Sequence, residues 1–446
     1  MEVIGVHAGH CGIGMGNAFM AHMESIEEID NPARTFYNRG ERPYYRGLLV
    51  DHDIKTLTNL EYGWSESWKH LEEANVVGRA ATHADPSGAM YSTQALWRLQ
   101  LDERLRREAE KCCKLSGFLL TAGLEGNTGS SVMSFLTSAL PELYSKTTLL
   151  AVALVPSTVL GSSPLQIYAA VLGLASLVES DTATLLVDNE ALIDILRNFL
   201  HLSQVEYRDT NALVASLLEL VFATSSIASR DERPYFPWAD AVTSLTPTGL
   251  PFLVPGLSPL TSVKSVSQTA QRHPLSSLLR APPASVYDVV LDAFNPAGCL
   301  TAVDTLTGHT LQAGMFLRNV LPQTFTEMTT EWSVFQPKIY ERWRQHVPKN
   351  ITASSHLTPR EPPAAASLEN STAVARSFCS LLADCRKAFR RRSFTHCFSS
   401  GPLEVADIDT AMESLTSAVD LYSSEHVAAN ATLMPVECPS IQWVDL

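Results

Sequence analysis

The stretch that decides the fold is Leu119-Leu120-Thr121-Ala122-Gly123-Leu124-Glu125-Gly126-Asn127-Thr128-Gly129-Ser130-Ser131. The apolar run at 117–121 predicts a buried parallel strand, and the apolar residues that follow recur at helical spacing: Val132, Phe135, Leu136, Leu140 and Leu143. A glycine-containing turn therefore joins a strand to a helix. Such a turn directs backbone N–H groups and the positive end of the helix dipole at one point, as phosphate binding requires. Taken alone, an ordinary strand-to-helix connection is the simpler interpretation.

Bulk composition limits the class of protein. A chain of 446 residues with 45% hydrophobic residues is long enough for roughly two or three hydrophobic cores. The formal net charge of −14 argues against sequence-independent nucleic-acid binding, because phosphate contacts need a basic face. No apolar run approaches the roughly 20 residues of a membrane-spanning helix, and no signal peptide is visible. We therefore expect an intracellular protein whose eight cysteines are reduced.

A second glycine-rich turn lies near the N-terminus. Residues 1–6 predict a strand, and Gly9-His10-Cys11-Gly12-Ile13-Gly14-Met15-Gly16 leads into a helix whose apolar face carries Phe19, Met20, Met23 and Ile26. The spacing Gly12-x-Gly14-x-x-Asn17 approaches the dinucleotide-binding fingerprint but lacks its third glycine. His7 and His10 could suggest a metal, but two histidines without further ligands are more often surface or capping residues.

Strands and helices alternate through the middle of the chain. Strands at 47–51, 148–155 and 182–187, with helices at 164–179 and from Asp188 onward, predict a parallel sheet covered by helices on both faces. Asp51 and Asp53 follow the strand at 47–51, where such sheets place ligand-facing carboxylates. Simple solvation of these two acids is an equally good interpretation.

Six blocks of sequence, in order, resemble the tubulin family. In the first turn, where tubulins read Gly-Gln-Cys-Gly-Asn-Gln-x-Gly, this chain keeps the glycines and Cys11 and replaces the amides with His10, Ile13 and Gly14. The central loop resembles the phosphate loop Gly-Gly-Gly-Thr-Gly-Ser-Gly with three of seven positions changed, which puts the Glu125 carboxylate beside the expected phosphates. The other blocks are Ala74-Asn75 with Arg79, Leu177-Val178-Glu179 with Asp188-Asn189-Glu190-Ala191-Leu192, residues 253–262, and Asn370-Ser371-Thr372 with residues 390–396.

The resemblance implies a site for GTP and Mg²⁺. Magnesium would be held near Asp51 and Asp53, and the implied nucleotide contacts are His10, Cys11, Asn75, Gly126, Asn127, Thr128, Gly129, Ser130, Gln166, Asn189, Tyr207 and Asn211. Tyr207 would stack on guanine, and the two amides of Asn189 and Asn211 would recognise its edge. Without the family spacing, Asn189 would be interpreted as a helix cap, and Tyr207 and Asn211 as the outer face of an amphipathic helix that carries Leu213, Leu217, Leu218 and Val221.

No catalytic residue can be assigned from the sequence. The position of the glutamate that assists hydrolysis in alpha-type tubulins falls at Ala239 without a gap and at Asp240 with a one-residue gap. Because a polarised water needs a carboxylate within hydrogen-bond distance, hydrolysis stays doubtful.

The implied architecture is the tubulin fold, of α/β class. A parallel-sheet, Rossmann-like GTPase domain is expected at 1–228, a smaller α+β intermediate domain with a lateral-contact loop at 229–366, and C-terminal helices and a tail at 367–446. Within these domains we expect a strand at 299–306 and a loop or insertion at 348–366. Asn370-Ser371-Thr372 is expected to cap a long helix, and a second helix is expected at about 403–422.

The implied function is that of a divergent tubulin of delta, epsilon or zeta type, not alpha or beta. Such a protein would be a GTP-binding constituent of microtubules in the cytoplasmic cytoskeleton, specialised for basal bodies, centrioles and cilia. Its partners would be other tubulins in longitudinal association, without nucleic acid or membrane. Two alternatives stay open: an active, self-polymerising GTPase, and a pseudo-GTPase with a degenerate nucleotide site.

Overall fold

The computed structural model describes residues 2–26, 36, 44–51, 75–78, 94–156, 163–198, 200, 202–223, 238–259, 286–319, 350–356, 363–398, 404–431 and 440–443. Several sequence predictions lie outside these residues, among them Asp53, Ala74, Arg79, the domain boundary at 228/229 and the lateral-contact loop at 263–279.

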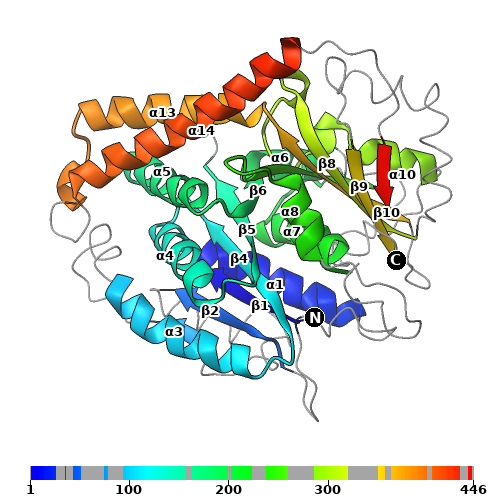
Figure 1. The fold of residues 1–446 in the computed structure, drawn as a ribbon, viewed down its shortest axis with the longest axis horizontal. Coiled ribbons are helices and arrows are strands. Elements are labelled where there is room, and N and C mark those ends of the chain that lie inside the picture. Colours follow the sequence, from blue (N-terminus) through cyan, green and yellow to red (C-terminus); the bar gives the residue numbers. More distant parts are fainter. Residues whose placement is uncertain are drawn as a thin grey trace.

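One eleven-stranded sheet runs through the described part of the molecule, in the order β11-β9-β8-β10-β7-β6-β5-β4-β1-β2-β3 (Figure 1). Its first half is parallel and consists of β1 (Glu2–Ala8), β2 (Gly47–Asp51), β3 (Val76–Gly78), β4 (Leu115–Gly123), β5 (Thr148–Val155) and β6 (Ala183–Asp188). β7 (Phe252–Ser258) pairs with β6 and joins this half to β8 (Thr310–Arg318), β9 (Asn350–His356), β10 (Ala364–Ser371) and β11 (Ser440–Trp443). β10 is antiparallel to both of its neighbours, β7 and β8.

Helices cover both faces of the parallel half, as the continuous apolar strands predict. Alternate residues of β4 serve separate cores: Phe118 and Leu120 pack on one side, and Leu119 packs on the other. The first core is closed by α3 (Gln94–Glu110), α4 (Asn127–Leu143), α5 (Pro164–Glu179), α13 (Val374–Arg390) and α14 (Val405–Ala431). The second core is closed by α1 (Gly9–Ile26), α6 (Asn189–Asn198), α7 (Tyr207–Ala223) and α8 (Trp238–Leu245). A further helix, α10 (Val286–Ala293), packs against β7 and β10.

The predicted α/β class with a largely parallel sheet is confirmed, and β5 and α5 have the predicted bounds. Among the described side chains, the prediction of an inward-facing apolar residue is wrong for Leu143. Leu143 is 53% exposed, because it is the last residue of α4 and lies beyond the part of the helix that packs on the sheet. Among the described residues, no helix combines the length and apolar character needed to cross a membrane.

The strand predicted at 299–306 is wrong. Cys299 forms a single bridge with Gly256, and the N–H of Leu300 donates to Pro255 O while its carbonyl accepts from Asp188 N. Leu300 therefore bridges β6 and β7, and the strand pairing does not continue beyond it. The chain then turns into the 3₁₀ helix η6 (Thr305–Thr307).

The loop or insertion predicted at 348–366 is also wrong, because β9 and the start of β10 lie there. The small residues Ala364, Ala365 and Ala366, which suggested a loop, are buried residues of β10. Ala365 pairs with both Ser258 and Leu317, and Ala366 pairs with both Leu257 and Phe316.

The predicted cap of α13 is wrong at Asn370. This residue lies in β10, and its amide donates to Leu245 O at 3.0 Å and to Leu250 O at 2.7 Å. Its side chain therefore ties β10 to the end of α8, and α13 begins after Ala373 without a side-chain cap. The second C-terminal helix is confirmed, but α14 extends to Ala431.

Candidate functional site

The two glycine turns meet at the carboxyl ends of β1 and β4. Gly9, at the junction of β1 and α1, has a φ of +70°, which favours glycine. A Cβ atom on Gly9 would lie 3.1 Å from the Gly129 amide nitrogen, and one on Gly123 would lie 2.9 Å from Cys11 Cβ. The first turns of α1 and α4 therefore start side by side at one edge of the sheet.

The start of α4 is arranged as an anion site. Gly126 has extended backbone angles at the N-cap position, and no side chain from that position caps the helix. A Cβ atom on Gly129 would overlap the Gly123 carbonyl oxygen, so the backbone of the turn can close this tightly only around glycine. Neither α1 nor α4 has an acidic residue in its first turn. The positive ends of the two helix dipoles that meet here thus favour a bound anion.

The N-terminal turn of α7 lies against α1, near the point where the α1 and α4 turns meet. We call this group of turns at the strand ends the cluster. Tyr207 and Asn211 are one turn apart and share one face of the helix. Asn211 is buried, and a Cβ atom on Gly14 would lie 2.7 Å from its amide nitrogen, so Asn211 packs directly on α1. Tyr207 is 71% exposed. An aromatic ring thus stands in solvent beside an amide that the fold holds in place.

The start of α6 places Asn189 at the end of β6. Asp188 makes the helix cap, because its Oδ1 accepts from the Glu190 N–H at 2.8 Å. Asn189 is half-buried and is the first residue of α6. The simpler interpretation of Asn189 as the cap is therefore replaced by a capping role for its neighbour.

Glu125 brings negative charge into this cluster. Burial, followed by the charges of Glu190 and Glu125, raises the pKa of Asp188 to about 6. Burial, followed by the charge of Glu125, raises the pKa of the Cys11 thiol to about 12. The half-buried Glu125 carboxylate therefore acts on both the first turn of α1 and the end of β6. Cys11 is a neutral thiol at neutral pH.

Three of the predicted site residues have side chains that the fold uses. The Asn75 amide is buried and donates to Glu108 Oε1 at 2.9 Å. The Ser130 hydroxyl donates to Ala169 O at 2.6 Å and ties α4 to α5. Gln166 Oε1 accepts from the Ser163 N–H at 2.8 Å in the capping box of α5. Nucleotide contacts of these residues stay predictions, and the structure gives each side chain a structural role.

The predicted magnesium ligands are only partly described. Asp51 is buried at the end of β2, the strand next to β1. Within the described ranges, no three His, Cys, Asp or Glu side chains are grouped as metal ligands. Magnesium commonly relies on one or two carboxylates together with phosphate and water oxygens, so a single described carboxylate is compatible with it.

α8 resolves which of the two candidate hydrolysis positions faces outward. Ala239 is buried in the second core, whereas the next residue, Asp240, is exposed. Only the one-residue gap therefore places a carboxylate on the surface here.

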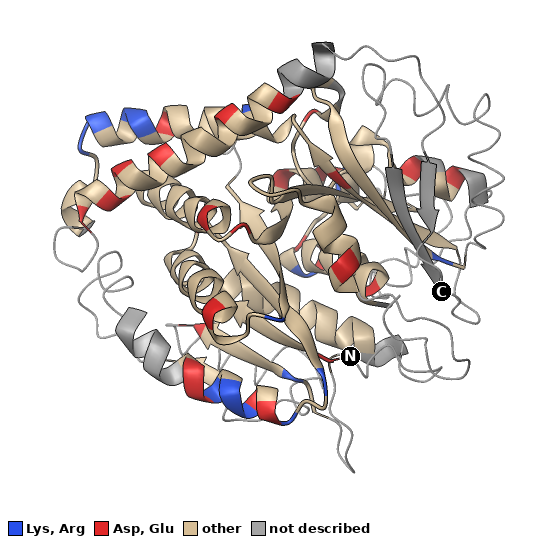
Figure 2. Cartoon of the chain, viewed as in Figure 1, with Lys and Arg blue, Asp and Glu red and all other residues tan. Residues whose placement is uncertain are grey.

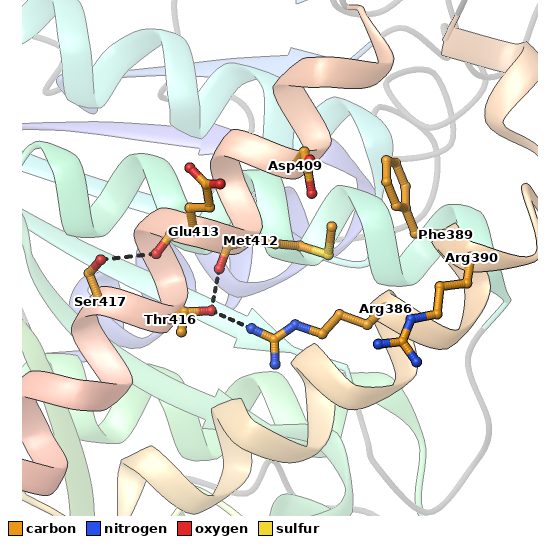
Figure 3. A pocket seen from close by; sticks show the side chains of 8 residues that line it. All are labelled: Arg386, Phe389, Arg390, Asp409, Met412, Glu413, Thr416 and Ser417. Carbon is orange, nitrogen blue, oxygen red and sulfur yellow. Dashed lines mark hydrogen bonds between the residues drawn. The ribbon is translucent and has the colours of Figure 1, made fainter.

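A groove of about 590 Å³ lies between the two C-terminal helices (Figure 3). Arg386 and Arg390 of α13 face Asp409 and Glu413 of α14 across it, and the Arg386 guanidinium donates to Thr416 Oγ1 at 2.7 Å. The ribbon in Figure 2 shows the same separation, with basic residues in blue at the end of α13 and acidic residues in red along α14. The groove shares no residue with the cluster at the strand ends.

Sequence reasoning was wrong about His7, which was expected at the surface or in a cap. Its ring is fully buried and hydrogen-bonded to Thr121 and Tyr45. The alternation of a β-strand shows that His7 points to the opposite face from its neighbours, but no local pattern indicates its hydrogen-bond partners.

Comparisons with known proteins agree with this arrangement. Residues 2–197 match the Tubulin/FtsZ family, GTPase domain. The chain is 25% identical to the tubulin beta chain of Candida albicans over 446 residues, which covers 96% of this chain and 95% of that protein. It is also 25% identical to the tubulin beta-3 chain of Echinococcus multilocularis over 440 residues, covering 94% and 95% of the two chains. The chain is therefore similar to the Tubulin/FtsZ GTPase domain over residues 2–197 and to beta-tubulins along nearly its whole length.

Proposed function

We propose that this protein is a divergent tubulin that binds GTP and takes part in microtubule structures. The observation that carries the proposal is the contact between Gly9 and Gly129, which brings two helix N-termini to one point. The nucleotide phosphates would occupy that point, at the positive ends of the α1 and α4 helix dipoles. Mg²⁺ would bind the phosphates near Asp51 and Asp53.

The guanine would lie against α7. The exposed Tyr207 ring offers a stacking surface, and the buried Asn211 amide offers both a donor and an acceptor. Asn189 would approach the base from the start of α6. Packing of Asn211 on Gly14 holds the amide still, which limits the conformational entropy that base recognition costs.

The proposed partners are other tubulins, in longitudinal association. We infer a specialised role at basal bodies or centrioles from the departures in the phosphate loops, including His10, Gly14, Glu125 and Asn127. The groove between α13 and α14 lies on the outer helices, where the family presents its external ridge.

A pseudo-GTPase is the second candidate, and Glu125 favours it. Its carboxylate acts electrostatically on both Cys11 and Asp188, so it stands beside the proposed phosphates. Like charges in a confined site repel, so an empty site would follow if Glu125 is not neutralised by Mg²⁺ or a proton. An active GTPase is the third candidate, favoured by the exposed carboxylate of Asp240.

The first test is to denature the purified protein and to identify any released nucleotide by chromatography, beside a Glu125→Gly variant. Stoichiometric guanine nucleotide in both proteins is expected. Nucleotide in the variant alone would favour the pseudo-GTPase, and nucleotide in neither would overturn the proposal.

Two further measurements separate the remaining alternatives. Phosphate release in the presence of tubulin that is lost in Asp240→Ala, but kept in Ser244→Ala on the same helix, would favour the active GTPase. A tagged protein is expected at basal bodies, and labelling of entire cytoplasmic microtubule arrays would contradict the specialised role.

A further inference from the structure

A buried chain of hydrogen bonds lies beneath the first turn of α1. His7 Nδ1 is 2.7 Å from Thr121 Oγ1, His7 Nε2 is 2.8 Å from the Tyr45 hydroxyl, and the Thr121 hydroxyl donates to Gly12 O at 2.8 Å. These hydrogen bonds join β1, β4, α1 and Tyr45, which lies two residues before β2. The residues of the chain come from sequence positions as far apart as 7 and 121.

Each proton in this chain has one consistent place. The Thr121 hydroxyl uses its only hydrogen on Gly12 O, so its oxygen accepts from His7 Nδ1–H. A neutral imidazole with a proton on Nδ1 accepts at Nε2, so the Tyr45 hydroxyl donates there. The bonds therefore run in one direction, from Tyr45 through His7 and Thr121 to Gly12.

Burial keeps His7 neutral and so maintains this direction. Desolvation lowers the pKa of His7 to about 3, and burial likewise raises the pKa of Tyr45 above its usual range. Among the residues that the structure describes, the hydrogen-bond partners of the His7 ring are the hydroxyls of Thr121 and Tyr45, and none is a carboxylate.

Glycines make room for the rings of the chain. A Cβ atom on Gly16 of α1 would overlap the His7 ring, and Cβ atoms on Gly5 or Gly47 would overlap Tyr45. A Cβ atom on Gly12 would overlap the Thr121 carbonyl oxygen. α1 thus lies directly on the sheet at this point, and the hydrogen-bond chain defines where its first turn sits.

We propose that His7 is a positioning residue for the first anion-binding turn, acting through Thr121 on the Gly12 carbonyl. The inference rests on the proposed nucleotide site, because Gly12 follows Cys11 and the turn that touches Gly129. The Thr121 hydroxyl donates a hydrogen bond to the Gly12 carbonyl. His7 Nδ1–H donates to the oxygen of the same hydroxyl and so orients its proton toward Gly12. Tyr45 in turn holds the His7 ring in the required tautomer.

A pair of substitutions at Thr121 tests the proposal. Thr121→Ser keeps the hydroxyl, whereas Thr121→Val keeps the shape and removes it. We expect Thr121→Val to weaken binding of a fluorescent GTP analogue by about tenfold, the order of one lost buried hydrogen bond, while Thr121→Ser stays within about twofold. The loss of affinity in Tyr45→Phe is expected to lie between those of Thr121→Ser and Thr121→Val, because this substitution leaves His7 Nε2 without a hydrogen-bond donor.

The control is Tyr422→Phe, which removes a different buried hydroxyl, bonded to the Phe252 backbone between α14 and β7. All variants are compared at a temperature where circular dichroism shows them folded. Equal losses of affinity in Thr121→Val and Tyr422→Phe would overturn the positioning role, because a general loss of stability would then explain both.

Two readouts do not depend on nucleotide. Nitrogen NMR of the histidines is expected to show a neutral His7 ring from pH 5 to 8, because burial lowers its pKa to about 3. The proton is expected on Nδ1, because Thr121 Oγ1 accepts a hydrogen bond from that atom. Amide exchange in the first turn of α1 is expected to be faster in Thr121→Val than in Thr121→Ser. Unchanged exchange would overturn the positioning role, whereas a wild-type protein that binds no nucleotide would overturn only the proposed function.

Discussion

Arg318 and Glu219 form a buried ion pair that joins β8 to α7, a helix that packs on the parallel half of the sheet. Arg318 Nη1 lies 2.8 Å from Glu219 Oε2, and His22 Nε2 lies 3.9 Å from the same carboxylate oxygen. The three residues belong to β8, α7 and α1 respectively. α1 and α7 both begin at the candidate nucleotide site, so the pair connects the far ends of these helices to the second half of the molecule.

Breaking this pair from one side is expected to be costly. Glu219→Gln or Arg318→Met should each lower the free energy of unfolding by about 3–5 kcal/mol, because each leaves one buried charge without its partner. The double variant should lose clearly less than the sum of the two. Urea unfolding of the four proteins measures this coupling. The control is Arg106→Ala in the exposed pair with Glu103, which solvent screens and which should change stability little. Additive losses would mean that the two side chains do not act as a pair.

Tyr207→Ala is expected to weaken binding of guanine nucleotide without unfolding the protein. The ring is 71% exposed, so its removal costs the fold little, whereas a stacked base loses about 1–3 kcal/mol, or roughly 5- to 150-fold in affinity. Tyr207→Phe keeps the stacking surface and should bind nearly as the wild type does. Titration with a fluorescent GTP analogue measures both variants. Leu143→Ala removes a 53% exposed side chain at the far end of α4 and serves as the control. Equal affinities for Tyr207→Ala and Leu143→Ala would rule out stacking.

Local sequence signals predicted the elements of the first half well. The runs that became β5 and α5 have uninterrupted apolar or helical patterns with clear boundaries, so their ends could be predicted to the residue. Predictions for the second half of the chain were wrong where residues are buried by pairing with distant strands. Ala364 to Ala366 carry no strand signal of their own and are strand residues only because β7 and β8 flank them.

The candidate site was predictable to the extent that it is made of backbone. Glycine turns such as those at Gly9 and Gly129 are visible in the sequence because their geometry requires glycine. The bond from Asn75 to Glu108 and the contacts of His7 were not visible, because each joins side chains more than thirty positions apart. Such polar pairs depend on the fold and cannot be predicted from local sequence patterns.

Asp188→Asn is expected to stabilise the protein at neutral pH and to remove a pH dependence. Burial raises the pKa of Asp188 from 3.8 to about 6, so between these pH values the folded state holds a proton that the unfolded state has lost. This contribution therefore makes the protein less stable as pH rises from 3.8 to about 6, and its full cost is present above that. Two units of pKa correspond to at most about 3 kcal/mol.

Asparagine keeps the oxygen that accepts from Glu190, so the cap of α6 is preserved. The measurement is urea unfolding of Asp188→Asn and wild type across this pH range, and the difference between them should grow with pH and then level off. Asp194→Asn, an exposed acid on the same helix, should show no such difference. A difference between Asp188→Asn and wild type that does not change with pH would contradict the role of the proton.

Removing the last strand is expected to make the protein self-associate. β11 pairs in parallel with β9, from Ser440 opposite Asn350 to Trp443 opposite Ala353, and it closes that edge of the sheet (Figure 1). An exposed edge strand presents unpaired N–H and C=O groups to other molecules. After truncation at residue 439, the sedimentation coefficient should therefore rise more steeply with protein concentration than in the wild type.

Truncation after Trp443 removes only the residues beyond the strand and should behave as wild type. Ile441→Pro keeps the length of the chain but removes a backbone donor and should resemble the longer truncation if pairing is the cause. Identical sedimentation of all four proteins would show that β11 does not protect the edge of β9.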